Sequence, residues 1–354
     1  MAKDDLLNRF CRTFDRRSFL KACGVMGLGA AGGAVVQALF EVVKIDRGLV
    51  RVARTHLAMG TFITITAVNE SRDRAQEAIG RAYEEIDRLI AILSRHDSTT
   101  AVSVLNDRGL LLDPPAELLE VVRRSLDFHR LSRGAFDVTI KPLVDLLETV
   151  RGGAAAPSRE KIQATLESVG SQMIEVDGGR LRFARPAMGI TLDGIAKGYI
   201  VDRASATLAA HGIDNHLINA GGDIRARGCR SQTRAWSVAV QDPHKRGDYP
   251  DVIRLRNGAV ATSGSYEVFF DRERVYHHII DPRTGSSPGH SVSVSVVAES
   301  AMGADALSTA VFVMGPQQGV GLIDHLRHSE CLLLRENGER FASEGWGNMR
   351  GTTC

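Results

Sequence analysis

The chain has 354 residues, of which 44% are hydrophobic and 5% aromatic, and its formal net charge at pH 7 is +2. This length and hydrophobic content suffice for a large core in one domain or in two lobes. Residues 1–38 carry six basic and three acidic side chains, so the rest of the chain is close to neutral. A near-neutral body lacks the basic surface that nucleic-acid binding requires, and we expect no nucleic-acid partner.

The N-terminal segment has the pattern of an export signal. Residues 15–21 (DRRSFLK) contain paired arginines, and a weakly apolar, glycine-rich run follows over 22–36. That run is shorter than the ~20 residues that a membrane-spanning helix needs. The pattern predicts a twin-arginine signal peptide over 1–38, with the twin-arginine translocase as a partner and the periplasm as the location. The alternatives are an N-terminal anchor or a chance arginine pair.

The first half of the chain alternates between strand and helix patterns. Periodicity and turn residues predict the following elements: a linker over 39–54, a strand over 61–68, helices over 72–93 and 116–131, and a loop over 134–139 that enters a short strand. Small residues at 151–157 (RGGAAAP) indicate a division between two lobes near 150–160.

The second half contains more strands. We expect helices over 158–169, 195–210, 301–314 and 317–327, and strands over 174–176, 180–183, 188–192, 216–219, 236–240, 252–255, 259–261, 276–280, 291–298 and 330–335. This order lacks a regular βαβ rhythm. It predicts an α+β fold of mainly antiparallel sheets flanked by helices, in one two-lobed domain over 55–345 with a tail over 346–354.

The central stretch is 191–203 (TLDGIAKGYIVDR), where an expected strand meets a helix at Asp193 and Gly194. A helix start offers unpaired N–H groups and a positive dipole end, which together bind phosphates. Lys197 lies in the first turn, where a cation opposes the helix dipole. A bound anion would explain this lysine; the alternative is an ordinary connection with a surface lysine.

A second candidate site lies on the helix expected over 301–314. Asp305 and Thr309 are four residues apart and therefore share one helix face. Carboxylate and hydroxyl oxygens suit Mg²⁺, which also binds substrate phosphates. A solvated Asp, or a Thr bonded to the preceding turn, is the alternative. The helix is otherwise small or apolar, which indicates that it packs against the body.

His277 and His278 fall on an expected strand, so their side chains should point to opposite faces. One of them can act as a general base near pH 7, and a half-buried structural histidine is the alternative. Glycine turns at 220–223 and 262–265 allow close backbone approach to a ligand, or simply end strands. The motifs of P-loop, dinucleotide-binding and nucleophilic hydrolase sites do not occur.

Taken together, these segments resemble the ApbE family of FAD:protein FMN transferases. The motifs that carry the resemblance, in family order, are MGT (59–61), LSRHDSTTAVSVLN (93–106), GAFDVTIKPL (134–143), DGIAKGYIVDR (193–203), NAGGDI (219–224), ATSGSYE (261–267), HIIDPRTG (278–285) and ADALSTA (304–310). They cover about residues 55–335.

The resemblance implies an enzyme that binds FAD with Mg²⁺ and moves FMN onto a Thr or Ser hydroxyl of an acceptor protein, releasing AMP. The implied acceptor is a periplasm-facing domain of a membrane redox complex. Two alternatives stay open. With water as acceptor, the same site would be an FAD pyrophosphatase that releases FMN and AMP. Without catalysis, the protein would be a periplasmic FAD-binding carrier or assembly protein.

The resemblance also implies roles for individual residues. The implied FAD contacts are Met59, His96, Ala135, Phe136, Asp137, Thr191, Asp193, Lys197, Thr262, Ser263 and Ile279. Asp305, Thr309 and the backbone carbonyl of Gly194 would hold Mg²⁺, and His278 would be the base. The chain departs from the family at Thr191, where an Asp is usual, and at Asp193, where a Gly or Ser is usual. Either Asp193 replaces the missing carboxylate, since residues 191 and 193 of an extended segment share a face, or FAD affinity is reduced.

Overall fold

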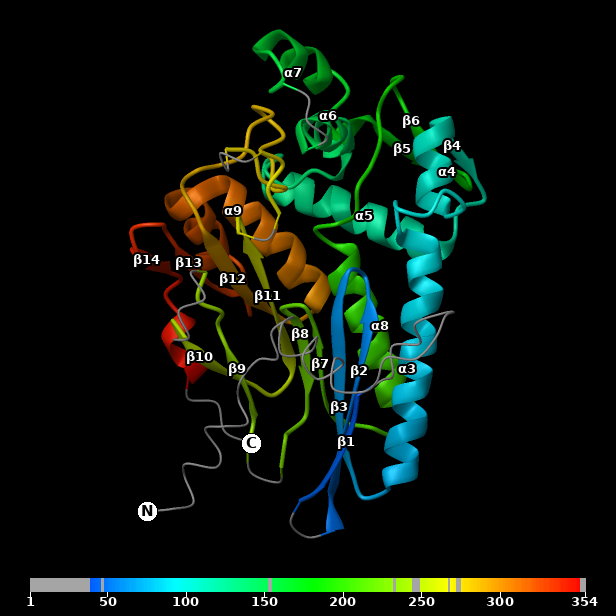
Figure 1. Ribbon diagram of the computed structural model, residues 1–354, viewed down its shortest axis with the longest axis vertical. Coiled ribbons are helices and arrows are strands. Elements are labelled where there is room, and N and C mark those ends of the chain that lie inside the picture. The colour runs from blue at the N-terminus through cyan, green and yellow to red at the C-terminus, as the bar shows by residue number, and fades with distance from the viewer. Residues whose placement is uncertain are drawn as a thin grey trace, which may run out of the picture. The chain divides into compact units, whose positions relative to one another are not determined.

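The computed structural model describes residues 39–45, 48–151, 155–231, 234–243, 249–266, 268–271 and 275–350 (Figure 1). The signal peptide expected over 1–38 lies outside the described residues. The strands are β1 (Leu39–Lys44), β2 (Val50–Ala58), β3 (Thr61–Asn69), β4 (Leu110–Leu112), β5 (Ile174–Asp177), β6 (Arg180–Phe183), β7 (Asn215–Ala220), β8 (Asp223–Arg227), β9 (Trp236–Ala239), β10 (Val252–Leu255), β11 (Gly258–Gly264), β12 (Ser293–Ala298), β13 (Glu330–Leu334) and β14 (Arg340–Ala342). The helices are α3 (Arg72–Leu93), α4 (Ala101–Arg108), α5 (Ala116–Leu131), α6 (Lys141–Arg151), α7 (Arg159–Leu166), α8 (Ala196–Ala210) and α9 (Ala301–Asp324), with short 3₁₀ turns η2 (Val138–Ile140), η3 (Ser171–Met173) and η4 (Trp346–Arg350).

A large antiparallel sheet forms the centre of the fold, in the order β1-β2-β3-β7-β8-β11-β12-β13-β14. The alternation in β3 explains how its two faces are used. Ile63, Ile65 and Ala67 are buried in the core that also contains α3, α8 and α9, whereas Val68 belongs to a second core on the other face. The expected α+β fold with mainly antiparallel sheets flanked by helices is therefore confirmed.

Helices α3, α8 and α9 pack together against one face of this sheet (Figure 1). Among the described helices, α9 alone is long and apolar enough by composition to span a membrane, but most of its apolar stretch is buried in the protein core. As expected, α9 is interrupted at Gly315, where φ is 78°, and Pro316. Pro316 has no N–H to donate to the carbonyl of Phe312, and His290 Nε2 donates to that oxygen instead, at 3.0 Å.

The opposite face of the sheet is covered by β9, β10 and η4. Trp346 is buried there, and its indole N–H donates to Asp251 at 2.9 Å. The prediction of a tail that begins at residue 346 is therefore wrong for residues 346–350, because a tryptophan buries enough apolar area to hold the segment on the body.

The expected linker over 39–54 is also wrong, because β1 occupies residues 39–44 and β2 begins at Val50. The two strands pair with each other in antiparallel register, for example Val42 with Val52. A division between lobes near 150–160 stays a prediction.

Two expected strands, 188–192 and 276–280, are absent from the described sheets. The Asn106 side chain bonds both the N–H and the carbonyl of Ile190, at 2.7 and 2.9 Å. Residues 276–278 form only an isolated bridge with 268–270, in which Phe270 N–H donates to the Tyr276 carbonyl at 2.8 Å. Asp271 accepts the N–H of Tyr276, and Ser287 accepts that of His277. The short strand expected after residue 134 is instead the 3₁₀ turn η2, which leads directly into α6.

Candidate active site

The candidate site is built where the start of α8 meets the first half of α9. The N–H of Gly198, in the first turn of α8, donates to Asp305 Oδ2 at 3.1 Å. A Cβ on Gly198 would lie 2.3 Å from the carbonyl oxygen of Ala301, so only glycine lets the two helix backbones approach this closely. Asp305 is 6% exposed, since small residues on both helices surround it. The carboxylate therefore lies in the contact between the helices.

Gly194 and Thr309 meet one helical turn away from that contact. A Cβ on Gly194 would lie 3.1 Å from Thr309 Oγ1 and 3.4 Å from the ring of Phe136. Thr309 Oγ1 is also 3.3 Å from Ser263 Oγ, which bonds Ser308 Oγ at 2.8 Å. The three residues implied as magnesium ligands thus come from two segments, α9 and the turn before α8, and Phe136 and Ser263 lie beside them.

The charges around Asp305 favour a cation. Lys197 Nζ lies 3.0 Å from Asp223 Oδ2, and Asp223 is only 2% exposed. Burial and the negative charge of Asp223 raise the pKa of Asp305 well above its usual range, against the opposing effect of Lys197. Two buried carboxylates therefore share one lysine. Such a site, with carboxylate, hydroxyl and carbonyl oxygens, fits a divalent hard cation.

In the described part of the chain, no group of three or more His, Cys, Asp or Glu side chains is placed to hold a metal ion. A magnesium site does not require such a group, because Mg²⁺ usually binds through one or two carboxylates together with water and substrate phosphates. The mixed donor set at Asp305, Thr309 and Gly194 matches that pattern.

The position of Lys197 has an explanation that the sequence did not provide. Its ammonium group pairs with Asp223 at the turn between β7 and β8, so a bound anion is not needed to account for a lysine in the first turn of α8. Whether this lysine also contacts FAD stays a prediction.

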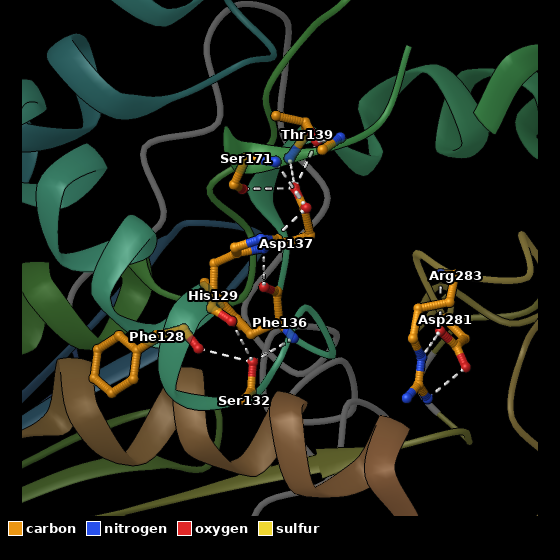
Figure 2. A network of polar contacts seen from close by, with 10 residues as sticks. Phe128, His129, Ser132, Phe136, Asp137, Thr139, Ser171, Asp281 and Arg283 are labelled. Atoms are coloured by element: carbon orange, nitrogen blue, oxygen red, sulfur yellow. Dashed lines mark hydrogen bonds and ion pairs between the residues drawn. The ribbon is translucent and has the colours of Figure 1, made fainter. Parts of the chain in front are cut away.

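Asp137 is the centre of a buried polar network (Figure 2). Its carboxylate accepts hydrogen bonds from Thr139 and Ser171, and its Oδ2 lies 3.1 Å from His129 Nδ1. Burial alone would raise the pKa of Asp137, but these contacts outweigh burial and hold it below its ordinary value. The carboxylate therefore fixes the loop that carries Ala135 and Phe136, both buried, and its oxygens are engaged within the protein.

Thr191 and Asp193 do not share a face, contrary to the expectation from an extended segment. The chain turns at 193–195, so Thr191 is buried and Asp193 is exposed. Asp193 Oδ2 accepts from Arg95 Nε at 2.9 Å, and Arg95 Nη2 lies 3.5 Å from Glu148. Asp193 thus forms a surface ion-pair network beside Gly194, and it does not occupy the place of a carboxylate at residue 191.

The other implied FAD contacts lie on separate elements. Met59 has a φ of 51° in the β2–β3 turn and packs half-buried against the core. His96 is exposed just after α3, and Ile279 is buried. Thr262 bonds Ser295 Oγ at 2.8 Å, and because neighbouring residues of a strand face opposite ways, it faces away from Ser263 and α9.

His277 and His278 lie in different surroundings, and His277 matches the alternative of a structural histidine. His277 Nε2 donates to the Pro288 carbonyl at 3.1 Å and Nδ1 accepts the N–H of Ile279 at 3.3 Å. Burial lowers its pKa to about 4, so His277 is a neutral structural residue near pH 7. Its ring packs on Phe312 of α9, with 5.6 Å between ring centroids.

His278 is half-buried, and its Nδ1 lies 3.3 Å from the carbonyl oxygen of Val268. A carbonyl oxygen can only accept, which assigns the proton to Nδ1 and makes Nε2 the basic nitrogen. In the turn that follows, the Arg283 guanidinium donates two hydrogen bonds to the Asp281 carboxylate, each 2.8 Å long (Figure 2). The neutral, buried His277 is therefore the structural member of the pair, and the role of His278 as a base stays a prediction.

Sequence reasoning missed two residues of this site. Asp223 ends the glycine turn at 220–223, where its acidic side chain was a signal for a charged partner. Asp202, on α8, accepts the first N–H groups of α9. Nothing in the local sequence indicates that contact.

These features define an α+β protein with a carboxylate–hydroxyl site in the contact between two helices. The model of the ApbE family matches residues 59–333, and the chain belongs to this family. It is therefore an enzyme of the transferase class.

Two relatives of known name cover three quarters or more of the chain. A protein of Treponema pallidum (strain Nichols) named FAD:protein FMN transferase is 30% identical over an aligned length of 351 residues, and the alignment covers 91% of this chain and 92% of the relative. A protein of Vibrio cholerae serotype O1 with the same name is 33% identical over an aligned length of 275 residues, and the alignment covers 75% of this chain and 82% of the relative.

Solved structures agree with the sequence relatives. The flavin transferase ApbE from Vibrio cholerae superposes with a TM-score of 0.73 at 27% identity, covering 84% of this chain and 99% of that one. The ApbE protein from Thermotoga maritima superposes with a TM-score of 0.77 at 30% identity, covering 89% of this chain and 100% of that one.

Proposed function

We propose that this chain transfers FMN from FAD to a Thr or Ser hydroxyl of an acceptor protein, with Mg²⁺ as the metal and AMP as the leaving product. The observation that carries the proposal is the meeting of Gly194 with Thr309 beside the buried carboxylate of Asp305. The names of the relatives, FAD:protein FMN transferase, support the same reaction.

Three groups would hold the metal: the Asp305 carboxylate, the Thr309 hydroxyl and the carbonyl of Gly194. Bound Mg²⁺ would offset negative charge on the diphosphate of FAD. The protein contributes a dry, fixed setting, since Asp305 is already oriented by the N–H of Gly198 and Thr309 by Ser263. Lys197 balances Asp223 and so limits the negative charge that surrounds the substrate.

His278 is the proposed base for the acceptor hydroxyl. Its Nε2 takes the hydroxyl proton while the hydroxyl oxygen forms a bond to the FMN-side phosphorus. The bond from that phosphorus to the bridging oxygen breaks, and AMP leaves with the electron pair. The Val268 carbonyl supports this role by keeping the other proton on Nδ1.

The remaining proposals concern binding and location. We assign FAD contacts to Met59, His96, Ala135, Phe136 and Ile279, with the backbone of Asp137 in place of its engaged carboxylate. The twin-arginine pattern at 15–21 supports export to the periplasm by the twin-arginine translocase. A periplasm-facing domain of a membrane redox complex is the proposed acceptor, since such a domain would share that compartment.

A gel assay tests the function. Protein, FAD, Mg²⁺ and a candidate acceptor domain are mixed, and the acceptor band of a denaturing gel is examined for covalent flavin fluorescence. The band should appear with the wild type, disappear with Asp305→Ala, and persist with Asp107→Ala, which removes an exposed carboxylate on α4. A full-strength band with Asp305→Ala, or no band with a competent acceptor, would overturn the proposal.

The same mixture without acceptor separates the alternatives. Rapid AMP release in the absence of acceptor would indicate an FAD pyrophosphatase. Tight FAD binding without AMP under any condition would indicate a carrier or assembly protein. The transferase predicts AMP release that depends on the acceptor and equals the flavin incorporated.

A further inference from the structure

The starts of α8 and α9 are capped by each other. Asp202 of α8 accepts the N–H groups of Ala301 and Met302, one on each carboxylate oxygen, both at 2.9 Å. In the other direction, Asp305 of α9 accepts the N–H of Gly198. Each helix therefore supplies a carboxylate to the unpaired N–H groups at the start of the other.

Local capping cannot replace these contacts. The N-cap residue of α8 is Ile195, which has no side-chain acceptor. The N-cap of α9 is Ser300, whose hydroxyl accepts the N–H of Gly303 at 3.0 Å and leaves the two preceding N–H groups to Asp202. Without Asp202, those groups would need water in a half-buried contact.

The contacts form a ladder with a spacing of one helical turn. Gly194 lies against Thr309, Gly198 against Asp305, and Asp202 against Ala301. Each step advances four residues along the α8 segment and goes back four residues along α9. The two segments therefore run antiparallel in one fixed register.

This register positions the groups at the other end of the ladder. The close approach at Gly198 fixes the distance between the backbones of α8 and α9. A glycine has no side chain to interlock with α9, so this approach alone does not prevent α8 from shifting along the axis of α9. The bidentate contact of Asp202 does, because both of its oxygens are directed at consecutive N–H groups of α9. Arg225 Nε, 3.7 Å from Asp202 Oδ1, supports the carboxylate from the sheet.

We infer that Asp202 is a positioning residue: it sets the register of α8 against α9 and thereby the geometry of Gly194, Asp305 and Thr309, without touching any of them. The inference rests on the proposed function, in which these three residues hold Mg²⁺. Loss of a group that orients metal ligands typically weakens metal binding by about 10–100-fold.

The first test measures the Mg²⁺ concentration that gives half-maximal flavin transfer. Asp202→Ala should raise it by about 10–100-fold, and the isosteric Asp202→Asn, which keeps one acceptor oxygen, should raise it less. Ser300→Ala is the matched control, because it removes a cap from the same helix start but no bond to α8. It should lower Tm comparably and leave the Mg²⁺ dependence unchanged.

The second test does not depend on activity. Hydrogen exchange of the Gly198 amide reports whether its bond to Asp305 persists. Exchange should become faster in Asp202→Ala and Asp202→Asn, and stay at the wild-type rate in Ser300→Ala. Asp202 variants that lose Tm but keep both the wild-type Mg²⁺ dependence and the wild-type Gly198 exchange would overturn the inference.

The two tests also separate this inference from the proposed function. If the wild type transfers no flavin with any acceptor, the proposed function fails, and the exchange rate of Gly198 alone decides on Asp202. If the wild type transfers flavin and the Asp202 variants match Ser300→Ala in both readouts, the inference fails and the function stands.

Discussion

Lys197 Nζ lies 3.0 Å from Asp223 Oδ2, which joins the first turn of α8 to the turn between β7 and β8. Asp223 is almost fully buried, and its charge acts on the nearby Asp305. The lysine therefore supplies a positive charge that offsets the repulsion between two neighbouring buried carboxylates. Its removal should lower the free energy of unfolding.

Lys197→Met should destabilise the protein, because it removes the ammonium group that pairs with the buried Asp223 carboxylate near Asp305. Breaking a buried pair in this way costs about 3–5 kcal/mol, and partial exposure of the lysine places the expected loss at the lower end. Denaturant unfolding measures it. The double variant Lys197→Met/Asp223→Asn should recover much of the loss; a double variant less stable than Lys197→Met alone would contradict the pairing.

Asp305→Asn should separate stability from activity. The side-chain oxygen of asparagine can still accept the N–H of Gly198, while the desolvated charge is removed, so the free energy of unfolding without metal should stay the same or rise. Mg²⁺ with FAD should raise the Tm of the wild type by mass action but not that of the variant. An equal Tm increase in both proteins would exclude Asp305 as a ligand.

Gly198→Ala should force α8 and α9 apart, since the new Cβ would meet the Ala301 carbonyl at 2.3 Å. Overpacking of this kind costs about 1–3 kcal/mol. Gly80→Ala is the matched control: Gly80 is also helical, but its added Cβ has nothing within 4 Å, and the change should stabilise α3 by about 0.5–1 kcal/mol. Denaturation curves of the two variants should therefore shift in opposite directions.

His216 should make stability depend on pH. It is fully buried, and Nδ1 donates to the Ile213 carbonyl at 2.7 Å while Nε2 accepts from Ser205, also at 2.7 Å. Burial lowers its pKa from 6.5 to about 4, so the unfolded chain binds the proton more readily. The stabilising contribution of neutral His216 is complete above pH 6.5 and is lost as the pH falls towards about 4.

The full loss amounts to about 3 kcal/mol. Urea midpoints at several pH values between 7.5 and 4 measure it. The stability of His216→Asn should be lower at pH 7.5 and should fall less steeply with decreasing pH, because the variant lacks the protonation of His216. It should still fall, because His277 is also buried and has a pKa of about 4. Parallel curves for the two proteins would show that His216 does not titrate in this way.

Local patterns predicted the long helices well, because the amphipathic period lies within a single segment, but the shorter α4 and α6 were not expected. The expected helices over 72–93 and 116–131 are α3 and α5 with the same bounds. The strands expected over 188–192 and 276–280 failed for the opposite reason. The backbone of Ile190 bonds the side chain of Asn106, which is distant in sequence, and residues 276–278 form only an isolated bridge with 268–270.

The site shows the same division. That Asp305 and Thr309 share a face followed from their spacing alone. Their contact with Gly194 depends on the packing of α8 against α9. Gly198 permits this packing, but no local sequence pattern predicts it. The pairing of Lys197 with Asp223 could likewise not be predicted from the sequence, because it joins a helix to a turn between two strands of the sheet.

The most direct measurement is anomalous diffraction from crystals grown with FAD and Mn²⁺ in place of Mg²⁺. We predict an anomalous peak within bonding distance of the Asp305 carboxylate, the Thr309 hydroxyl and the Gly194 carbonyl, adjacent to the diphosphate of FAD. A peak bound elsewhere, or bound FAD whose diphosphate lies away from these three groups, would contradict the assignment.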